Sequence, residues 1–173
     1  ITEDGVEVFL LEDKTWKFVN EKDEQTMKTL STNPSPFTKS KEATFLARSK
    51  AVNGGLYYNP KKWGINKGDI YGPTIDHVFV SKSQNSVIGM MSSEKAPIPT
   101  FENLKDILIA ASSKRANFFR LNHSEIREVN GKKVLFLDYS ANVKGIDFMY
   151  IGHYLIIDDG FVGVSAYTFK KDF

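Results

Sequence analysis

Apolar and polar residues alternate through much of the C-terminal third of the chain, between residues 118 and 169. In one run Leu135, Leu137 and Tyr139 fall at every second position, and in the next Phe148 and Tyr150 do the same. A period of two places such side chains on one face of a β-strand. The runs are separated by short turn sequences: Asn130-Gly131, Lys144-Gly145 and Asp158-Asp159-Gly160. Because Asn-Gly and Asp-Gly pairs adopt positive φ at low cost, we expect tight primed turns and an antiparallel meander.

A helical period precedes the meander, over residues 101–115. The apolar residues that recur at this spacing are Phe101, Leu104, Ile107, Leu108 and Ala111. They define one face of a helix, and Thr100 is in place to cap its N-terminus. Such a helix is suited to covering one face of a sheet.

Shorter β-prone runs occupy the N-terminal half. Residues 44–50, 56–58, 76–81 and 86–92 read as strands, and residues 6–11 and 15–19 as a hairpin. An isolated hairpin is marginally stable in water, so we expect it to pack on something else. Pro34 and Pro36 lie in a polar stretch, and residues 21–43 are therefore predicted to be a linker.

The order of strands, helix and further strands predicts an α+β fold rather than a parallel βαβ sheet. We expect a twisted antiparallel β-sheet flanked by one or more helices, with an N-terminal β-hairpin appendage. The predicted divisions are the hairpin at 1–20, the linker at 21–43 and the α+β domain at 44–173.

Composition narrows the class of protein. The chain has 173 residues, 41% of them hydrophobic and 25% charged, which is typical of a globular protein. It contains no cysteine, so disulfides, thiolate metal sites and a cysteine nucleophile are excluded. No apolar run, including the one at 154–157, is long enough to span a bilayer.

Charge is unevenly distributed along the chain. Residues 1–25 hold eight acidic residues against three lysines, whereas the formal net charge of the whole chain is +2. The acidic hairpin could dock on the basic remainder and regulate it, or both could be solvated surfaces. The first residue is Ile1 rather than Met, and removal of a secretory signal is one reason to expect an extracytoplasmic location: periplasmic, secreted or lipid-anchored with the anchor removed.

The residue types that carry chemistry show no recognisable pattern. His77, His123 and His153 are far apart in sequence, and no two of them have metal-ligand spacing. Asp158 and Asp159 are explained by their turn, and no serine has a base at a suggestive spacing. We therefore predict no catalytic, cofactor-binding or metal-binding residues.

Aromatic residues interleave with lysines between residues 57 and 71. They are Tyr57, Tyr58, Lys61, Lys62, Trp63, Lys67 and Tyr71. Such a mixture can bind nucleic acid or sugar, but it also fits a strand and a turn whose aromatics close the core. Because the charge excess of the main domain is small, we expect no nucleic acid partner.

These residues resemble a known family. Tyr58, Pro60 and Trp63 are similar to the Tyr-x-Pro-x-x-Trp opening segment of PsbP-like domains. Residues 128–135 and 146–154 look like the Val-Asn-Gly-x-x-Val and Phe-x-Tyr-x-Gly-x-Tyr core of their bacterial relatives. The resemblance covers residues 44–173. It implies the fold shared by the photosystem II extrinsic protein PsbP and a Ran-binding nuclear transport factor, whose members are mostly non-catalytic accessory or binding proteins.

The N-terminal hairpin has a resemblance of its own. Residues 2–19 are similar to a Thr-x-Asp-Gly and Thr-Trp-x-Tyr/Phe-Val hairpin at the start of some secreted bacterial proteins, which favours an exported protein.

Together these observations predict a non-enzymatic accessory or protein-binding module of the bacterial cell envelope. The expected partner is another protein, because exposed aromatics beside lysines make good anchors. The residues expected to contact it are Tyr57, Tyr58, Lys61, Lys62 and Trp63. The alternative is a small-ligand carrier or hydrolase that uses a cleft between sheet and helix, since catalytic groups can assemble from distant positions.

Overall fold

The computed structural model describes residues 8–10, 16–18, 21–84 and 86–173. The first four strands are β1 (Val8–Leu10), β2 (Trp16–Phe18), β3 (Ser31–Phe37) and β4 (Phe45–Arg48). They are followed by β5 (Gly55–Tyr58), β6 (Trp63–Lys67), β7 (Ile75–Ser81) and β8 (Ile88–Lys95). The meander consists of β9 (Phe118–Val129), β10 (Lys132–Val143), β11 (Ile146–Ile157) and β12 (Gly160–Phe169). The helices are α1 (Glu21–Lys28) and α2 (Phe101–Ser113), with short 3₁₀ turns at Asp69–Tyr71 and Lys170–Asp172.

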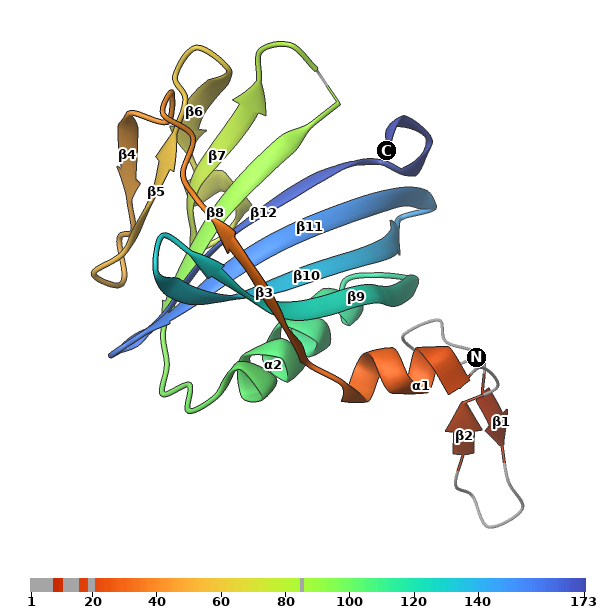
Figure 1. The fold of residues 1–173 in the computed structure, drawn as a ribbon. Coiled ribbons are helices and arrows are strands. Elements are labelled where there is room, and N and C mark those ends of the chain that lie inside the picture. Colours follow the sequence, from red (N-terminus) through yellow and green to blue (C-terminus); the bar gives the residue numbers. More distant parts are fainter. Residues whose placement is uncertain (1–7, 11–15, 19–20, 85) are drawn as a thin grey trace.

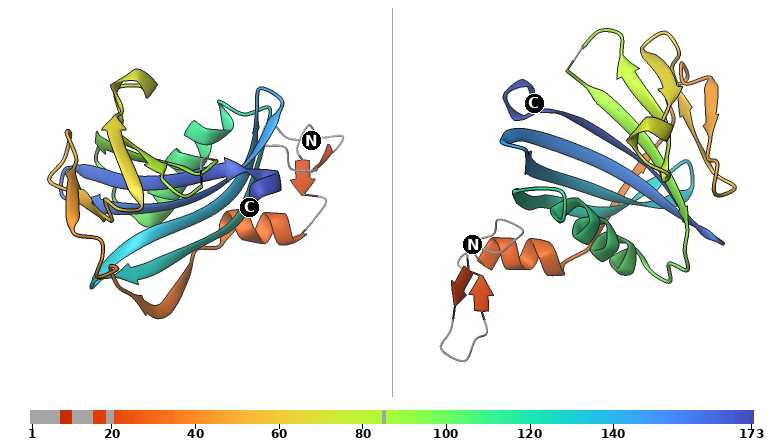
Figure 2. Two further views of the ribbon diagram at one scale, coloured as in Figure 1. Left: turned by 90° about the horizontal axis from the view of Figure 1, so that it is seen from above. Right: turned by 180° about the vertical axis from the view of Figure 1, so that it is seen from behind.

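One eight-stranded sheet forms the body, in the order β3-β9-β10-β11-β12-β8-β7-β6. Its strong twist turns β6–β8 away from the direction of β9–β11 (Figures 1 and 2). Strand β12 lies between β11 and β8, so it is an interior strand of the sheet. The α+β fold and the antiparallel meander are therefore confirmed. In the part of residues 1–20 that the structure describes, β1 pairs with β2 as a separate two-stranded sheet.

Two of the meander turns form as predicted. Asn130 and Gly131 have φ of 51° and 75°, and Lys144 and Gly145 have φ of 53° and 83°, so both pairs occupy the left-handed region of a primed hairpin turn. The expectation for the third turn is wrong, because none of residues 158–160 has a positive φ. Gly160 is instead the first residue of β12, where a Cβ would lie 2.0 Å from the Glu94 carbonyl oxygen of β8. Glycine is needed there for close approach of two strands.

The prediction of a linker over residues 21–43 is wrong for most of that segment, which contains α1 and β3. Strand β3 pairs with β9 in parallel, so the sheet is mixed and not wholly antiparallel. Its prolines are tolerated because β3 is an edge strand, and its pairing is interrupted between Thr32 and Pro36. Because most side chains of β3 are exposed, its sequence does not alternate between apolar and polar residues, and the strand could not be predicted from such a pattern.

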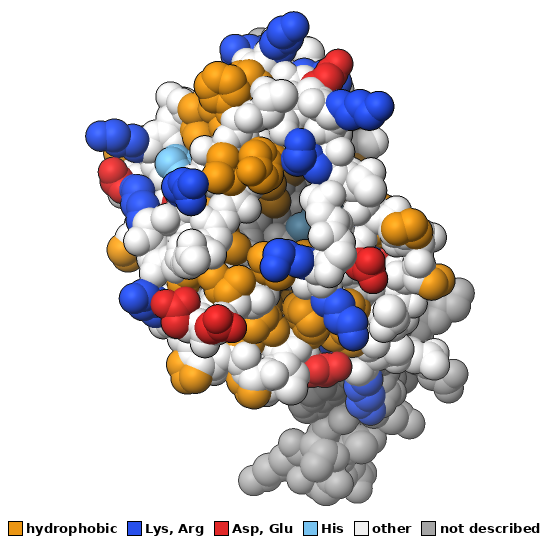
Figure 3. All heavy atoms as spheres, turned by 60° about the vertical axis from the view of Figure 1, so that its left-hand side comes forward, with side chains coloured by type: hydrophobic (Ala, Val, Ile, Leu, Met, Phe, Trp, Pro, Cys, Tyr) orange, Lys and Arg blue, Asp and Glu red, His pale blue; other side chains and the backbone are white. Residues whose placement is uncertain are grey.

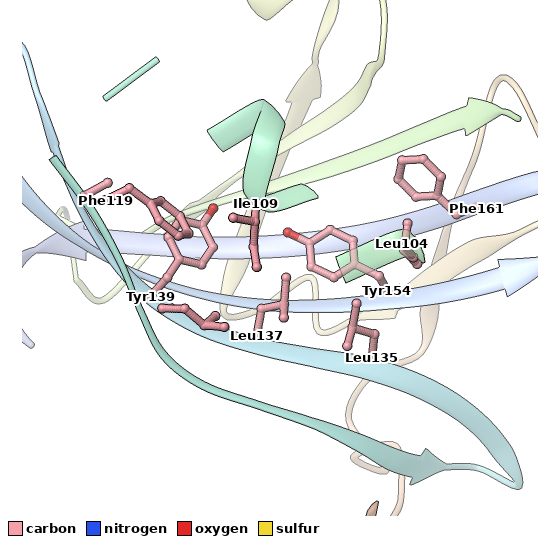
Figure 4. Packing of buried hydrophobic residues seen from close by; sticks show 10 residues of the cluster. Leu104, Ile109, Phe119, Leu135, Leu137, Tyr139, Tyr154 and Phe161 are labelled. Atoms are coloured by element: carbon pink, nitrogen blue, oxygen red, sulfur yellow. The ribbon is translucent and has the colours of Figure 1, made fainter. Parts of the chain in front are cut away.

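The two faces of the sheet are covered differently. Helix α2 packs on one face, with Thr100 capping it through a hydrogen bond from the Asn103 N–H. Figure 4 shows Leu104 and Ile109 of this helix close to labelled side chains of β10, β11 and β12. The buried cluster consists of Leu104, Ile109, Phe119, Leu121, Leu135, Leu137, Tyr139, Ala141, Tyr154 and Phe161. The β4–β5 hairpin lies over the opposite face, where a second and smaller cluster forms.

Candidate functional site

A cavity of about 840 Å³ lies between the β4–β5 hairpin and the sheet face opposite α2. We call it the β4–β5 cavity. The sheet contributes side chains from β7, β8, β10, β11 and β12, and the connection between β3 and β4 closes one side. Figure 3 views this side of the molecule, where apolar side chains gather in a hollow with lysine and arginine side chains around it. The volume falls within the roughly 300–1,000 Å³ of small-molecule sites.

The lining of the cavity follows from strand register. His153 pairs with Phe136 on one side and Val164 on the other, and Val164 pairs with Met91, so these side chains share one face. Two residues further along, Val134, Leu155 and Val162 form the next row. Because neighbouring positions on each strand point to the other face, the same strands also supply the cluster beneath α2. The floor of the cavity is therefore the second apolar face of the meander.

Aromatic packing and a buried polar network fix the hairpin over this floor. The Tyr58 ring meets the Phe79 ring of β7 edge-on, with centroids 5.3 Å apart. Asp76, only 2% exposed, accepts hydrogen bonds from Ser93 Oγ at 2.6 Å and from the Lys50 N–H at 3.2 Å. Ser49 Oγ in turn donates to Ser93 Oγ at 2.7 Å. Residues that follow β4 are thereby attached to β7 and β8.

Cationic side chains lie at the mouth of the cavity. In the sequence Lys39 precedes β4 and Lys62 follows β5, and Lys132 is the first residue of β10. Lys62 Nζ is 3.5 Å from Glu42 Oε2, which also accepts a hydrogen bond from Asn59 at 2.8 Å. The mouth thus combines three lysines with one carboxylate, so it is electropositive.

A polar cluster borders the floor on its β9 side. It consists of His123, Glu125, Arg127 and His153. Arg127 Nε donates to Glu125 Oε1 at 2.5 Å, and Arg127 Nη1 lies 3.3 Å from His153 Nε2. An arginine can only donate, so His153 Nε2 accepts and the proton of this neutral ring is on Nδ1. The guanidinium also stacks on the Phe136 ring, 3.4 Å from its centroid.

Two pKa values in this cluster are displaced from their ordinary ranges. Burial and, to a lesser extent, the positive charge of Arg127 lower the pKa of His153 to about 4. Burial acts to raise the pKa of Glu125, which is 8% exposed. Hydrogen bonds donated by Arg127, His123 and Asn33 outweigh burial and bring the pKa of Glu125 to about 2. At neutral pH the cluster therefore holds a carboxylate, a guanidinium and an uncharged imidazole.

The structure gathers four of the five predicted contact residues at this site. Tyr57, Tyr58, Lys62 and Trp63 line the cavity, whereas Lys61 is exposed and is not part of its lining. Trp63 was expected in a turn but is the first residue of β6, where it pairs with Ser81. Tyr58 and Trp63 are half-buried against the cluster beneath the hairpin, so they are less accessible than the prediction of an exposed rim implies.

The location of the expected cleft also differs. The alternative function predicted from the sequence required a cleft between sheet and helix, but the face beneath α2 is filled by its own apolar cluster. The large cavity lies on the other face because the short β4–β5 hairpin covers the sheet incompletely. A smaller cavity of about 370 Å³ borders α1 and includes His123 and Ser124.

The polar cluster was not predicted from the sequence, because His123 and His153 are far apart along it. His123, Glu125 and Arg127 occupy alternate positions of one predicted strand, and this period of two was the available signal. His153 joins them only through the β9-β10-β11 register. His77 stays apart, with its Nε2 2.9 Å from the Arg48 carbonyl oxygen. Within the described residues, no group of three or more His, Asp or Glu side chains is placed to hold a metal ion.

Comparison with known proteins supplies similarity of fold alone. No family model matches the chain, and no curated protein sequence matches it. A solved structure of a Pseudomonas aeruginosa protein of unknown function is similar, with 15% identity and a TM-score of 0.49, over 74% of this chain and 84% of that one. The solution structure of cyanobacterial PsbP from Synechocystis is also similar, with 16% identity and a TM-score of 0.49, over 66% of this chain and 73% of that one.

Cyanobacterial PsbP belongs to the family that the sequence motifs of this chain resemble. At this level of identity, neither structure carries a function or a binding residue over to this chain.

Proposed function

We propose that this chain is a non-enzymatic binding module that holds a small, largely apolar ligand in the β4–β5 cavity. The observation that carries the proposal is the cavity itself, with its volume of about 840 Å³ and a floor of Val134, Leu155, Val162 and Val164. Apolar surface in a cavity that is open to water is unfavourable in free energy, so a ligand that covers it gains affinity from the hydrophobic effect. This develops the ligand-carrier alternative rather than the expectation of a protein partner.

The chemistry of the lining favours binding over catalysis. Of the described residues that line the cavity, His153 is the one histidine, and burial keeps its imidazole uncharged at neutral pH. Its Nε2 already accepts from Arg127, which leaves that nitrogen unable to take a proton from a substrate.

A titration with N-phenyl-1-naphthylamine, a neutral apolar dye that fluoresces on leaving water, tests this proposal. We expect saturable binding to the full chain. Replacing Val164 by Trp fills the floor and is expected to reduce dye affinity at least tenfold. The control Val80→Trp adds the same ring on β7 at a position outside the cavity lining and should bind the dye as the native chain does. Thermal unfolding of both variants verifies that they fold. Equal dye binding by the native chain and a folded Val164→Trp variant would refute the proposal.

A protein partner that binds the exposed apolar side chains of the β4–β5 hairpin is the second candidate. Phe45, Leu46 and Tyr57 are 57%, 37% and 49% exposed, a density of apolar side chains that is typical of interaction surfaces. If this candidate is correct, the native chain should retain a stoichiometric partner from envelope extract, and a Phe45→Ser/Tyr57→Ser variant should not. Ile70→Ser is the control, because Ile70 is 86% exposed outside the hairpin.

We also propose an extracytoplasmic location, supported by the resemblance of residues 2–19 to hairpins of secreted bacterial proteins. None of the helices in the described part of the chain is long and apolar enough to cross a membrane. Release of the native protein by osmotic shock, with a cytoplasmic enzyme retained, is the expected result. Retention of both would contradict this location.

A further inference from the structure

We propose that the β4–β5 cavity takes a single-chain amphiphile with an anionic head, whose head lies between Lys39 and Lys132 and whose apolar chain lies along the floor. This inference rests on the proposed function and adds the chemical class of the ligand. It follows from the positive charge of the lysines at the mouth and from the aliphatic side chains of the floor.

The lysines at the mouth differ in how far their charge is neutralised. Lys62 faces Glu42, with 3.5 Å between Nζ and Oε2, so this pair is close to neutral. Lys39 and Lys132 form no ion pair with any carboxylate in the described part of the chain. Two positive charges are thus left at the entrance to an apolar space, where an anion gains more from them than in open water.

These two lysines are fixed to the same turn. The Lys39 N–H donates to Asn130 Oδ1 at 3.0 Å, and the Asn130 N–H donates to the Phe37 carbonyl at 2.9 Å. Lys132 follows Asn130 by two residues at the start of β10. The connection between β3 and β4 is therefore held against the β9–β10 turn, and both lysines belong to one end of the mouth.

The side chain of Lys39 is also held at the entrance. Its Nζ donates to the Ala43 carbonyl at 3.0 Å and lies 5.0 Å from the centroid of the Tyr57 ring. An ammonium group has three donors, and this arrangement leaves two for a ligand. Because the cation is partly positioned before binding, less conformational entropy is lost when an anion joins it.

The floor selects the other part of the ligand. It consists of aliphatic side chains from β10, β11 and β12, and the titratable side chain that borders them, His153, is uncharged. A ligand with polar groups along its length would leave them without hydrogen-bond partners against this surface. A ligand with one charge at its end and a hydrocarbon body is complementary to both parts of the site: the charge to the lysines and the hydrocarbon to the floor.

Calorimetric titration of the full chain with three amphiphiles tests the inference, each kept below its critical micelle concentration or, for dodecanol, below its solubility limit. The probes are dodecanoate, dodecanol and dodecyltrimethylammonium, which have apolar chains of nearly equal length and heads of different charge. We expect dodecanoate to bind roughly tenfold more tightly than dodecyltrimethylammonium. The double variant Lys39→Ala/Lys132→Ala should remove this preference and leave the affinity for dodecanol within about twofold. Lys144→Ala/Lys170→Ala is the matched control, since neither residue lines the cavity, and it should keep the preference.

The outcomes separate this inference from the proposed function. Equal binding of all three amphiphiles, or a preference for the cationic one, would overturn the anionic head while leaving an apolar ligand site in place. Absence of binding by all three would overturn both. A preference for dodecanoate that survives in the Lys39→Ala/Lys132→Ala variant would place the anion elsewhere and refute the assignment of these lysines.

Discussion

His153 lies in an environment unlike that of an exposed histidine. Its imidazole lies against the Phe136 ring and accepts a hydrogen bond from Arg127, and burial is the main cause of its low pKa. Protonation would place a second positive charge beside Arg127, with only Glu125 to offset it. We therefore expect this part of the cavity floor to respond to acid.

The sign of that response follows from proton uptake. The unfolded chain binds a proton at His153 near pH 6.5, whereas the folded chain binds it near pH 4. Between these values the unfolded state holds more protons, so the free energy of unfolding falls as pH is lowered through this window. His153→Gln should flatten the slope of stability against pH between 6.5 and 4, by up to about 3 kcal/mol over the window. Urea unfolding at several pH values measures it, and an unchanged slope in a folded variant would contradict the pKa assigned to His153.

At the scale of elements, the attachment of the β4–β5 hairpin depends on few polar contacts. Ser93 Oγ donates to Asp76 and accepts from Ser49, so it joins β8, β7 and the residues after β4. Ser93→Ala removes both bonds and leaves the buried Asp76 one donor short. We expect a loss of about 1–2 kcal/mol in unfolding free energy. Amide exchange in residues 46–57 should accelerate as well, because the hairpin opens locally.

Ser92→Ala is the matched control for this prediction. Ser92 precedes Ser93 on β8, and its side chain points to the other face of the strand. Its replacement should change neither stability nor exchange in the hairpin by a measurable amount. If both variants behaved alike, the network around Asp76 would not be what holds the hairpin in place.

Helix α2 gives the second prediction at this scale. Thr100 Oγ1 accepts the Asn103 N–H at 3.2 Å, as the sequence predicted for an N-cap. Thr100→Ala should reduce the free energy of unfolding by about 1 kcal/mol, whereas Thr100→Ser should retain most of it. Denaturant unfolding of both variants measures the difference. Equal stabilities of the two would indicate that the cap does not contribute.

What the sequence could predict follows from the same elements. The meander and α2 were predictable because period-two and helical patterns, the Asn130-Gly131 turn and the Thr100 cap are local signals. Strand β3 was not, because it pairs in parallel at the edge and tolerates Pro34 and Pro36 there. The polar cluster could not be predicted without the register of β9, β10 and β11, because His153 is 30 positions from His123 in the sequence. The cavity required knowledge of how much of the sheet the hairpin leaves uncovered.

At the scale of the whole molecule, the two faces of one sheet serve different purposes. The face beneath α2 is closed by a large apolar cluster and supplies stability. The opposite face is covered by a short hairpin that leaves a cavity of about 840 Å³ beneath it. We therefore expect ligand binding to change the environment of one face and not of the other. We propose that this difference between the two faces of the sheet decides where a ligand binds.

Methyl chemical shifts recorded by NMR on adding dodecanoate test this difference between the two faces of the sheet. We expect concentration-dependent shifts for Val134, Leu155, Val162 and Val164, which line the cavity. The methyl signals of Leu104 and Ile109 on α2, and of Leu137 in the sheet beneath this helix, should stay in place. Shifts confined to the cluster beneath α2, or no shifts at a concentration that saturates the calorimetric signal, would contradict a ligand site in the β4–β5 cavity.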